Sequence, residues 1–166
     1  MIDDIKLNDM FLDADSLISK GQIGEAQRVL EAIIAEDPSF GSAHNHLGWI
    51  YETKLRDYEN AEQHYRMALT FTPSYCPVYY NYSAVLSTQK RWDDLEKLLT
   101  DALKVQEINL ATIHNEFGIM YELQGKYDQA ITSYKNAVKN SLDIKNVDLY
   151  KGSIARCKSK QEIDNL

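Results

Sequence analysis

The sequence has 166 residues, 44% of them hydrophobic, with 7 glycines, 3 prolines and a formal net charge of −7 at pH 7. This composition is typical of one folded, largely helical domain or of one short array of repeats. The negative charge disfavours a phosphate backbone as a ligand, so we do not expect nucleic acid as a partner.

The N-terminus and the cysteines bear on the location. The segment MIDDIKLNDM carries acidic residues and lacks the apolar core of a signal peptide, and no segment approaches the roughly 18 apolar residues of a membrane span. Cys76 and Cys157 are far apart and belong to no paired motif, which disfavours a disulfide scaffold and a zinc site. We therefore expect a cytoplasmic protein without membrane insertion.

Most of the charge lies near the N-terminus. Residues 1–40 carry nine acidic and three basic side chains, a net charge of −6. This surplus of negative charge would steer a basic partner to the N-terminal part of the chain. The alternative is that these charges are ordinary solvated surface.

Apolar residues recur every three or four positions along the chain, which predicts helices. One position of this pattern recurs at spacings of 35, 34 and 35. It is occupied by alanine at Ala26, Ala61 and Ala130, and by the larger Leu95 in the third unit. The period predicts four units of two helices each, at about 7–40, 41–75, 76–110 and 111–142.

A ninth helix is expected at about 145–163. It has Val147, Tyr150, Ile154 and Cys157 on one face. This face would cover the apolar end of the last helix pair, as repeat arrays require.

Two segments 70 residues apart are nearly identical, HNHLGWIYE at 44–52 and HNEFGIMYE at 114–122. The second continues through GKYDQAITSYKNAV, so that Gly-x-x-Tyr is followed by Gly-x-Tyr-x-x-Ala-x-x-x-Tyr-x-x-Ala. This pattern resembles the tetratricopeptide repeat (TPR) family. The resemblance implies an all-α, right-handed α-solenoid of four helix-turn-helix units with a C-terminal capping helix, all in one domain, 1–166.

The repeated residues have an expected packing role. We expect Gly48 and Gly118 where two helix backbones approach closely, with Tyr65 and Tyr134 filling the wider gap towards the next unit. Packing of this kind does not explain the repeated asparagines, Asn45 and Asn115.

The resemblance also implies a non-catalytic protein-interaction adaptor, whose concave groove is lined by the first helix of each unit. Helical phase then predicts the groove residues. They are Phe11, Asn45, Trp49, Glu52, Tyr80, Asn81, Asn115, Ile119 and Glu122.

The predicted groove favours one class of ligand. Asparagine amides both donate and accept hydrogen bonds, so Asn45 and Asn115 would suit the backbone of an extended peptide. The alternative is that they are tolerated polar residues on a solvated helix. Asp15, Glu52 and Glu122 along the groove favour a neutral or basic apolar segment. In the family's carboxylate clamp for acidic chaperone tails only Asn81 would match, so such a tail is not an expected partner.

Catalysis and metal binding have little support. His44 and His114 occupy equivalent places about 20 Å apart, too far to share a metal ion. No phosphate-binding loop or nucleophile–base motif is evident, and no cofactor is expected. Cys157, beside Arg156 and Lys158, is either a thiol of lowered pKa or a buried structural residue.

Two other functions remain open from the sequence. The chain would serve as a dedicated cytosolic chaperone for an exported or assembling client, or as a structural module that self-associates, giving a homo-oligomer.

Overall fold

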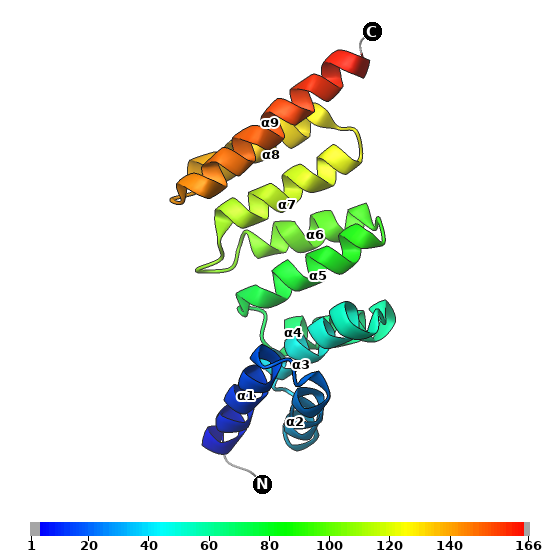
Figure 1. Ribbon diagram of the computed structural model, residues 1–166, viewed down its shortest axis with the longest axis vertical. Helices are drawn as coiled ribbons and strands as arrows, with labels where there is room; N and C mark the ends of the chain where they lie inside the picture. Colours follow the sequence, from blue (N-terminus) through cyan, green and yellow to red (C-terminus); the bar gives the residue numbers. More distant parts are fainter. Residues whose placement is uncertain (1–3, 165–166) are drawn as a thin grey trace. The chain divides into compact units, whose positions relative to one another are not determined.

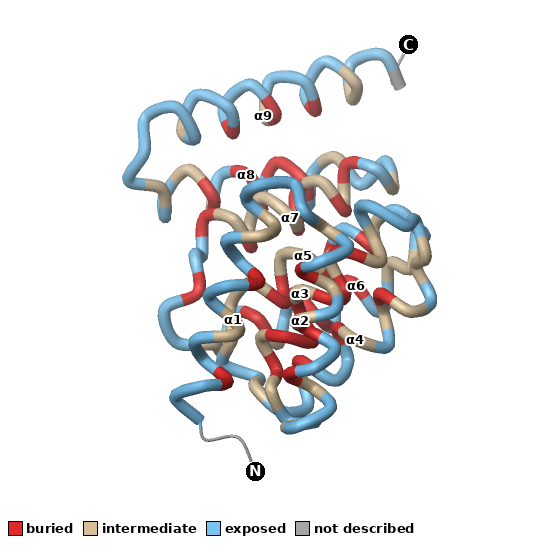
Figure 2. The backbone as a smooth tube through the Cα atoms, turned by 60° about the horizontal axis from the view of Figure 1, so that its bottom comes forward, coloured by how far each residue is buried: buried red, intermediate tan, exposed pale blue. Residues whose placement is uncertain are grey.

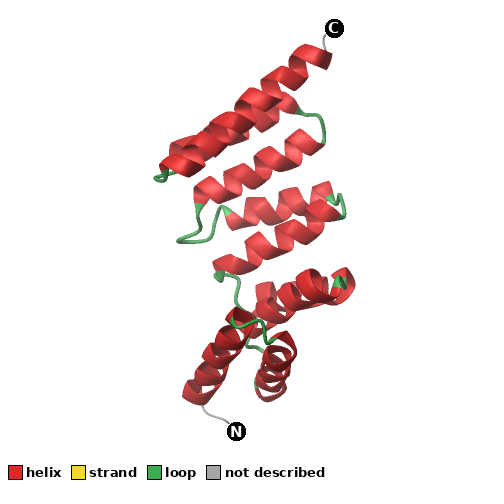
Figure 3. Cartoon of the chain, viewed as in Figure 1, coloured by secondary structure: helices red, strands yellow, loops and turns green. Residues whose placement is uncertain are grey.

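The computed structural model describes residues 4–164, which form helices joined by short turns, with no strand in this range (Figures 1 and 3). The helices are α1 (Asp4–Ser19), α2 (Ile23–Glu36), α3 (Gly41–Ile50), α4 (Tyr58–Phe71), α5 (Cys76–Thr88), α6 (Trp92–Ala102), α7 (Leu110–Leu123), α8 (Tyr127–Asn140) and α9 (Ile144–Asp164). A π-helical turn, Tyr51–Leu55, continues α3. This confirms the predicted all-α fold.

The chain divides into two compact units, and the boundary lies within α5, between Val85 and Leu86. We describe each unit by itself. The predicted single domain, and a third repeat at 76–110 that would pair α5 with α6, therefore stay predictions.

The first unit is built by successive helix packing. Helix α1 packs on α2, α2 on α3 and α3 on α4. Leu30, Ile33, Leu47 and Ile50 are fully buried in its core, where Figure 2 shows the buried segments of these helices. The burial follows the spacing of three or four residues expected for one apolar helix face.

In the second unit, α6 packs on α7, α7 on α8 and α8 on α9. The buried residues of α9 face α8 (Figure 2), and among them Tyr150, Ser153 and Cys157 are at most 5% exposed. The face predicted for the C-terminal helix is therefore the one that packs. No helix of residues 4–164 is long and apolar enough to cross a membrane.

The repeated glycines have a different packing role from the one expected. A Cβ atom added to Gly48 would lie 2.7 Å from Cδ1 of Tyr65, and one added to Gly118 would lie 2.5 Å from Cδ1 of Tyr134. Each glycine therefore makes room for a tyrosine ring of the second helix in its own pair. From the sequence, the tyrosines were expected to fill a gap towards the next unit, and their contact with the glycines was not predicted.

The turns that precede α2, α4, α6 and α8 each have a residue with a left-handed backbone, at spacings that match the sequence period. These residues are Gly21 (φ 76°), Arg56 (φ 54°), Lys90 (φ 56°) and Gly125 (φ 73°). Such a φ strains any residue with a Cβ atom, so two of the four turns carry strain.

We expect Lys90→Gly to raise the free energy of unfolding by about 0.5–1 kcal/mol. Glycine relieves the backbone strain of the folded state, and this gain outweighs the greater flexibility that glycine gives the unfolded chain. Gly125→Ala is the matched control. No heavy atom lies within 4 Å of the added Cβ atom. We therefore expect Gly125→Ala to lower the free energy of unfolding by about 1 kcal/mol through its left-handed φ alone. Urea unfolding measures both changes. A lower free energy of unfolding for Lys90→Gly would show that Lys90 is not strained.

Candidate functional site

A hollow of about 340 Å³ lies in the first unit, where residues of α1, α3 and α5 meet. Asn45 and Trp49, one helical turn apart on α3, line it together with Asn81 of α5. All three were predicted as groove residues. The full lining is Asp15, Ile18, Asn45, His46, Trp49, Tyr75, Pro77 and Asn81.

The two asparagines of the hollow bond to each other. Nδ2 of Asn81 donates to Oδ1 of Asn45 at 3.1 Å, which ties α5 to α3. Asn45 is only 2% exposed, whereas Asn81 is half-buried. An amide has two donors and an acceptor oxygen, so this bond uses only part of what Asn81 offers to a ligand.

Asp15 of α1 brings a carboxylate to the hollow. Nε2 of His46 lies 2.7 Å from its Oδ1, while Nδ1 of His46 donates to the backbone oxygen of Ser42 at 2.9 Å. Both partners are acceptors, so the imidazole donates to both only when each of its nitrogens carries a proton, and it then orients the carboxylate. The Asp15 side chain is 51% exposed, so the carboxylate remains accessible.

Two aromatic side chains, Trp49 and Tyr75, line the same hollow. Nζ of Lys54 lies 4.8 Å from the centroid of the Trp49 ring, a cation–π distance. Burial, together with the negative charge of Asp15, raises the pKa of Tyr75. Tyr75 was not predicted, because it lies in the turn that precedes α5.

The other residues predicted in the first unit lie outside the lining. Phe11 packs on Phe40 and on His46, with ring centroids 5.6 and 4.7 Å apart. Glu52 accepts a hydrogen bond from the Tyr65 hydroxyl at 2.6 Å, and burial raises the pKa of this carboxyl although the bond opposes the rise. Tyr80 is half-buried on α5.

In the second unit, Glu122 binds the C-terminal helix. Its carboxylate accepts from Nε of Arg156 at 2.7 Å, from Nζ of Lys160 at 2.8 Å and from the Tyr134 hydroxyl at 2.8 Å. Its side chain is only 7% exposed. The bond from Arg156, with the bonds from Lys160 and Tyr134, holds the pKa of Glu122 well below its usual range against the effect of burial.

The remaining predicted residues of the second unit, Asn115 and Ile119, are half-buried on α7. Ile119 packs on the cluster that contains Tyr134 and Cys157. Neither residue, nor Glu122, lines the hollow that contains Asn45, Trp49 and Asn81.

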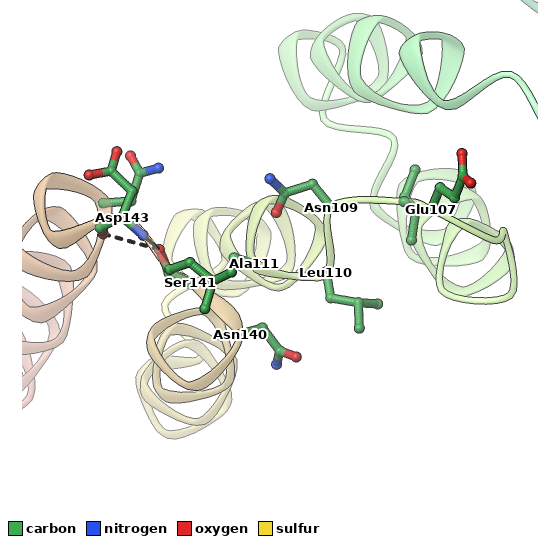
Figure 4. A pocket seen from close by; sticks show the side chains of 10 residues that line it. Glu107, Asn109, Leu110, Ala111, Asn140, Ser141 and Asp143 are labelled. Carbon is green, nitrogen blue, oxygen red and sulfur yellow. Dashed lines mark hydrogen bonds between the residues drawn. The ribbon is translucent and has the colours of Figure 1, made fainter.

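A second hollow, of about 450 Å³, lies among loops of the second unit (Figure 4). It joins the turn before α7 to the turn before α9, and Leu142 on its edge is fully exposed. Its lining is Glu107, Ile108, Asn109, Leu110, Ala111, Asn140, Ser141, Leu142, Asp143 and Asn146, with no aromatic or basic side chain. None of these residues was predicted.

The thiol of Cys157 has the environment of a structural residue. Burial first, and then the charge of Glu122, raise the pKa of Cys157 to about 11. This favours the buried alternative over the thiol of lowered pKa. Among residues 4–164, no three His, Cys, Asp or Glu side chains are placed to hold a metal ion.

We expect a thiol reagent to modify half-buried Cys76 in the folded protein and to reach Cys157 only on unfolding, because only a thiolate exposed to solvent reacts. Ellman's reagent with Cys76→Ser and Cys157→Ser separates the two thiols. Rapid reaction of Cys157 in the folded chain would contradict this assignment.

Two histidines of the first unit, His44 and His64, are hydrogen-bonded to each other. Nε2 of His44 lies 3.0 Å from the Pro38 oxygen and so donates, which leaves its Nδ1 to accept from Nδ1 of His64, also at 3.0 Å. Burial, with His44 nearby, lowers the pKa of His64 to about 4.

We expect the protein to lose roughly 1 kcal/mol of stability between pH 6.5 and pH 4, since His64 takes up its proton more readily unfolded than folded. His64→Gln keeps a donor for His44 and should flatten this part of the profile. Urea unfolding of both proteins at pH 7 and pH 5 measures the effect. If the free energy of unfolding falls by the same amount in wild type and in His64→Gln, the assignment to His64 is refuted.

Comparisons with known proteins fit this architecture. Residues 11–75 and 117–144 match two models described as tetratricopeptide repeat. No curated protein sequence matches the chain significantly.

Solved structures resemble the whole chain. PilF of Pseudomonas aeruginosa superposes with a TM-score of 0.83 at 21% identity, covering 96% of this chain and 70% of PilF. PilW, described as a type IV pilus biogenesis factor, gives 0.71 at 17% identity, with 95% and 80% coverage. A MamA structure gives 0.71 at 16% identity, with 95% and 89% coverage. Identities this low show the fold alone. With its helix pairs and the two family matches, the chain belongs to the tetratricopeptide repeat family.

Proposed function

We propose that the chain is an adaptor that binds a segment of another protein in the hollow of its first unit. TPR proteins are generally protein-interaction modules and typically non-catalytic. The observation that carries the proposal is the convergence of Asn45, Trp49 and Asn81 on one hollow of about 340 Å³.

The lining suits a bound polypeptide. The volume lies at the lower end of the range for ligand pockets, which suits an anchoring side chain rather than a large cofactor. The Asn81 amide can donate to or accept from a peptide backbone, and its bond to Asn45 holds it in place beforehand. Trp49 then supplies the large contact area that dominates binding energy.

The test is affinity capture from a lysate of the source cells, comparing wild type with Trp49→Ala. Met67→Ala is the matched control, because Met67 is a 39% exposed apolar residue on α4 outside the hollow. A protein held by wild type and by Met67→Ala but lost by Trp49→Ala supports the proposal. Capture of the same proteins by all three folded variants refutes it.

The cytoplasmic location, the chaperone and self-association alternatives, and a groove that extends to Asn115, Ile119 and Glu122 stay predictions.

A further inference from the structure

We infer that the hollow of the first unit recognises a basic side chain, lysine or arginine, in the bound segment. Asp15 would pair with the charge, and Trp49 and Tyr75 would flank it. This inference rests on the proposed function, and it names the chemistry of the partner.

The charge of the chain favours such a partner. Residues 1–85 carry six basic and thirteen acidic side chains, which accounts for the whole net charge of −7. Residues 86–166 carry twelve of each and are neutral. A basic segment is therefore attracted to the first unit and gains nothing from the second.

Within the hollow, the polar and aromatic groups match a cation. The carboxylate of Asp15 is half-exposed and held in position by His46, so it can accept from an ammonium or guanidinium group. Indole is the aromatic ring that attracts cations best, and the ammonium of Lys54 already lies over Trp49 at 4.8 Å. Ile18 and Pro77 in the lining offer apolar contacts to the alkyl stem of a lysine or arginine.

Two cationic groups face the same region and oppose the incoming charge. They are Lys54, over the Trp49 ring, and His46, when it is protonated against Asp15. Removal of the Lys54 charge should therefore strengthen the binding of a basic segment.

The experiment begins with a random peptide display library panned on the full chain, without bias towards any charge. Affinities follow from the fluorescence of Trp49 in a Trp92→Phe background, which leaves one indole, beside the hollow. Trp49→Ala, read by anisotropy of labelled peptides, identifies the peptides that use the hollow.

Peptides that depend on Trp49 are expected to share a lysine or arginine, whose replacement by glutamine weakens binding about tenfold. Asp15→Asn should weaken binding by a similar factor, because it keeps the shape and the acceptor for His46 and removes the charge. Asp13→Asn is the matched control, as an exposed acid on the same helix outside the lining. Lys54→Gln should tighten binding.

Each other result overturns the inference in a recognisable way. Peptides that depend on Trp49 but share no basic residue, or bind equally well to Asp15→Asn, contradict cation recognition and leave the proposed function standing. A library that yields no Trp49-dependent peptide contradicts both. Unchanged thermal unfolding of Asp15→Asn shows that a loss of affinity is not a loss of fold.

Discussion

Glu122→Ala is expected to lower the free energy of unfolding by about 2–3 kcal/mol at pH 7. The change removes the acceptor for Arg156 and Lys160 and leaves the hydroxyl of the buried Tyr134 without its partner. Because Arg156 and Lys160 are 51% and 44% exposed, solvent screens their share, and the tyrosine hydroxyl carries much of the loss. Glu122→Gln retains an acceptor for that hydroxyl and should lose less, about 1 kcal/mol.

The matched control is Glu52→Gln, at the equivalent position of the first unit. Glu52 also accepts a hydrogen bond from a tyrosine hydroxyl, but, whereas the pKa of Glu122 is lowered, burial raises the pKa of Glu52. Its ionised form is disfavoured on folding, so we expect Glu52→Gln to leave stability at pH 7 unchanged or slightly higher. Urea unfolding of the three variants measures these differences, and an equal loss from both glutamine variants would refute the assignment.

The pH dependence of Glu122 has a definite sign. The folded-state pKa of Glu122 is depressed, so its contribution is present above the ordinary glutamate pKa of about 4.3 and falls as the pH drops below it. The stability difference between wild type and Glu122→Gln should therefore shrink from pH 5 to pH 3. A difference that grows as the pH falls would contradict the ion pairs.

Gly118→Ala is expected to lower the free energy of unfolding by about 1–3 kcal/mol, because the new methyl group would overlap the Tyr134 ring. The ring is fully buried and its hydroxyl is bonded to Glu122, so it has little freedom to move. Gly48→Ala should cause a similar loss through Tyr65.

Gly152→Ala is the control for the helical glycines. Gly152 lies within α9, and a Cβ atom added there meets no heavy atom within 4 Å. The substitution should therefore raise stability by about 0.5–1 kcal/mol through helix propensity alone. Thermal or urea unfolding decides the matter, and a gain in stability on Gly118→Ala would show that the ring contact is absent.

The period of the sequence was enough to predict an all-α fold and the approximate places of its helices. The left-handed residues of four turns recur at the same spacings of 35, 34 and 35, while the division into four units stays a prediction. The hydrogen bonds from Tyr65 to Glu52 and from Tyr134 to Glu122 were not predicted, because a sequence pattern does not show which side chains meet. Such bonds depend on side-chain direction across two helices.

The candidate site was predictable in part. Helical phase found Asn45, Trp49 and Asn81, which line one hollow, but it missed Tyr75 in a turn. A signal for Tyr75 exists, since apolar or aromatic residues recur at spacings of 35 where α3, α5 and α7 begin. They are Phe40 and Tyr75, just before α3 and α5, and Leu110, the first residue of α7. The ion pairs of Glu122 with α9 were not predictable, because α9 departs from the repeat pattern.

The most direct test of the central claim is an NMR titration of ¹⁵N-labelled protein with a display-selected peptide. The account predicts that the indole N–H of Trp49 and the side-chain amide of Asn81 shift first, while the indole of Trp92 stays unchanged. Shifts confined to residues 107–111 and 140–146, around the hollow of the second unit, with Trp49 unmoved, would contradict it.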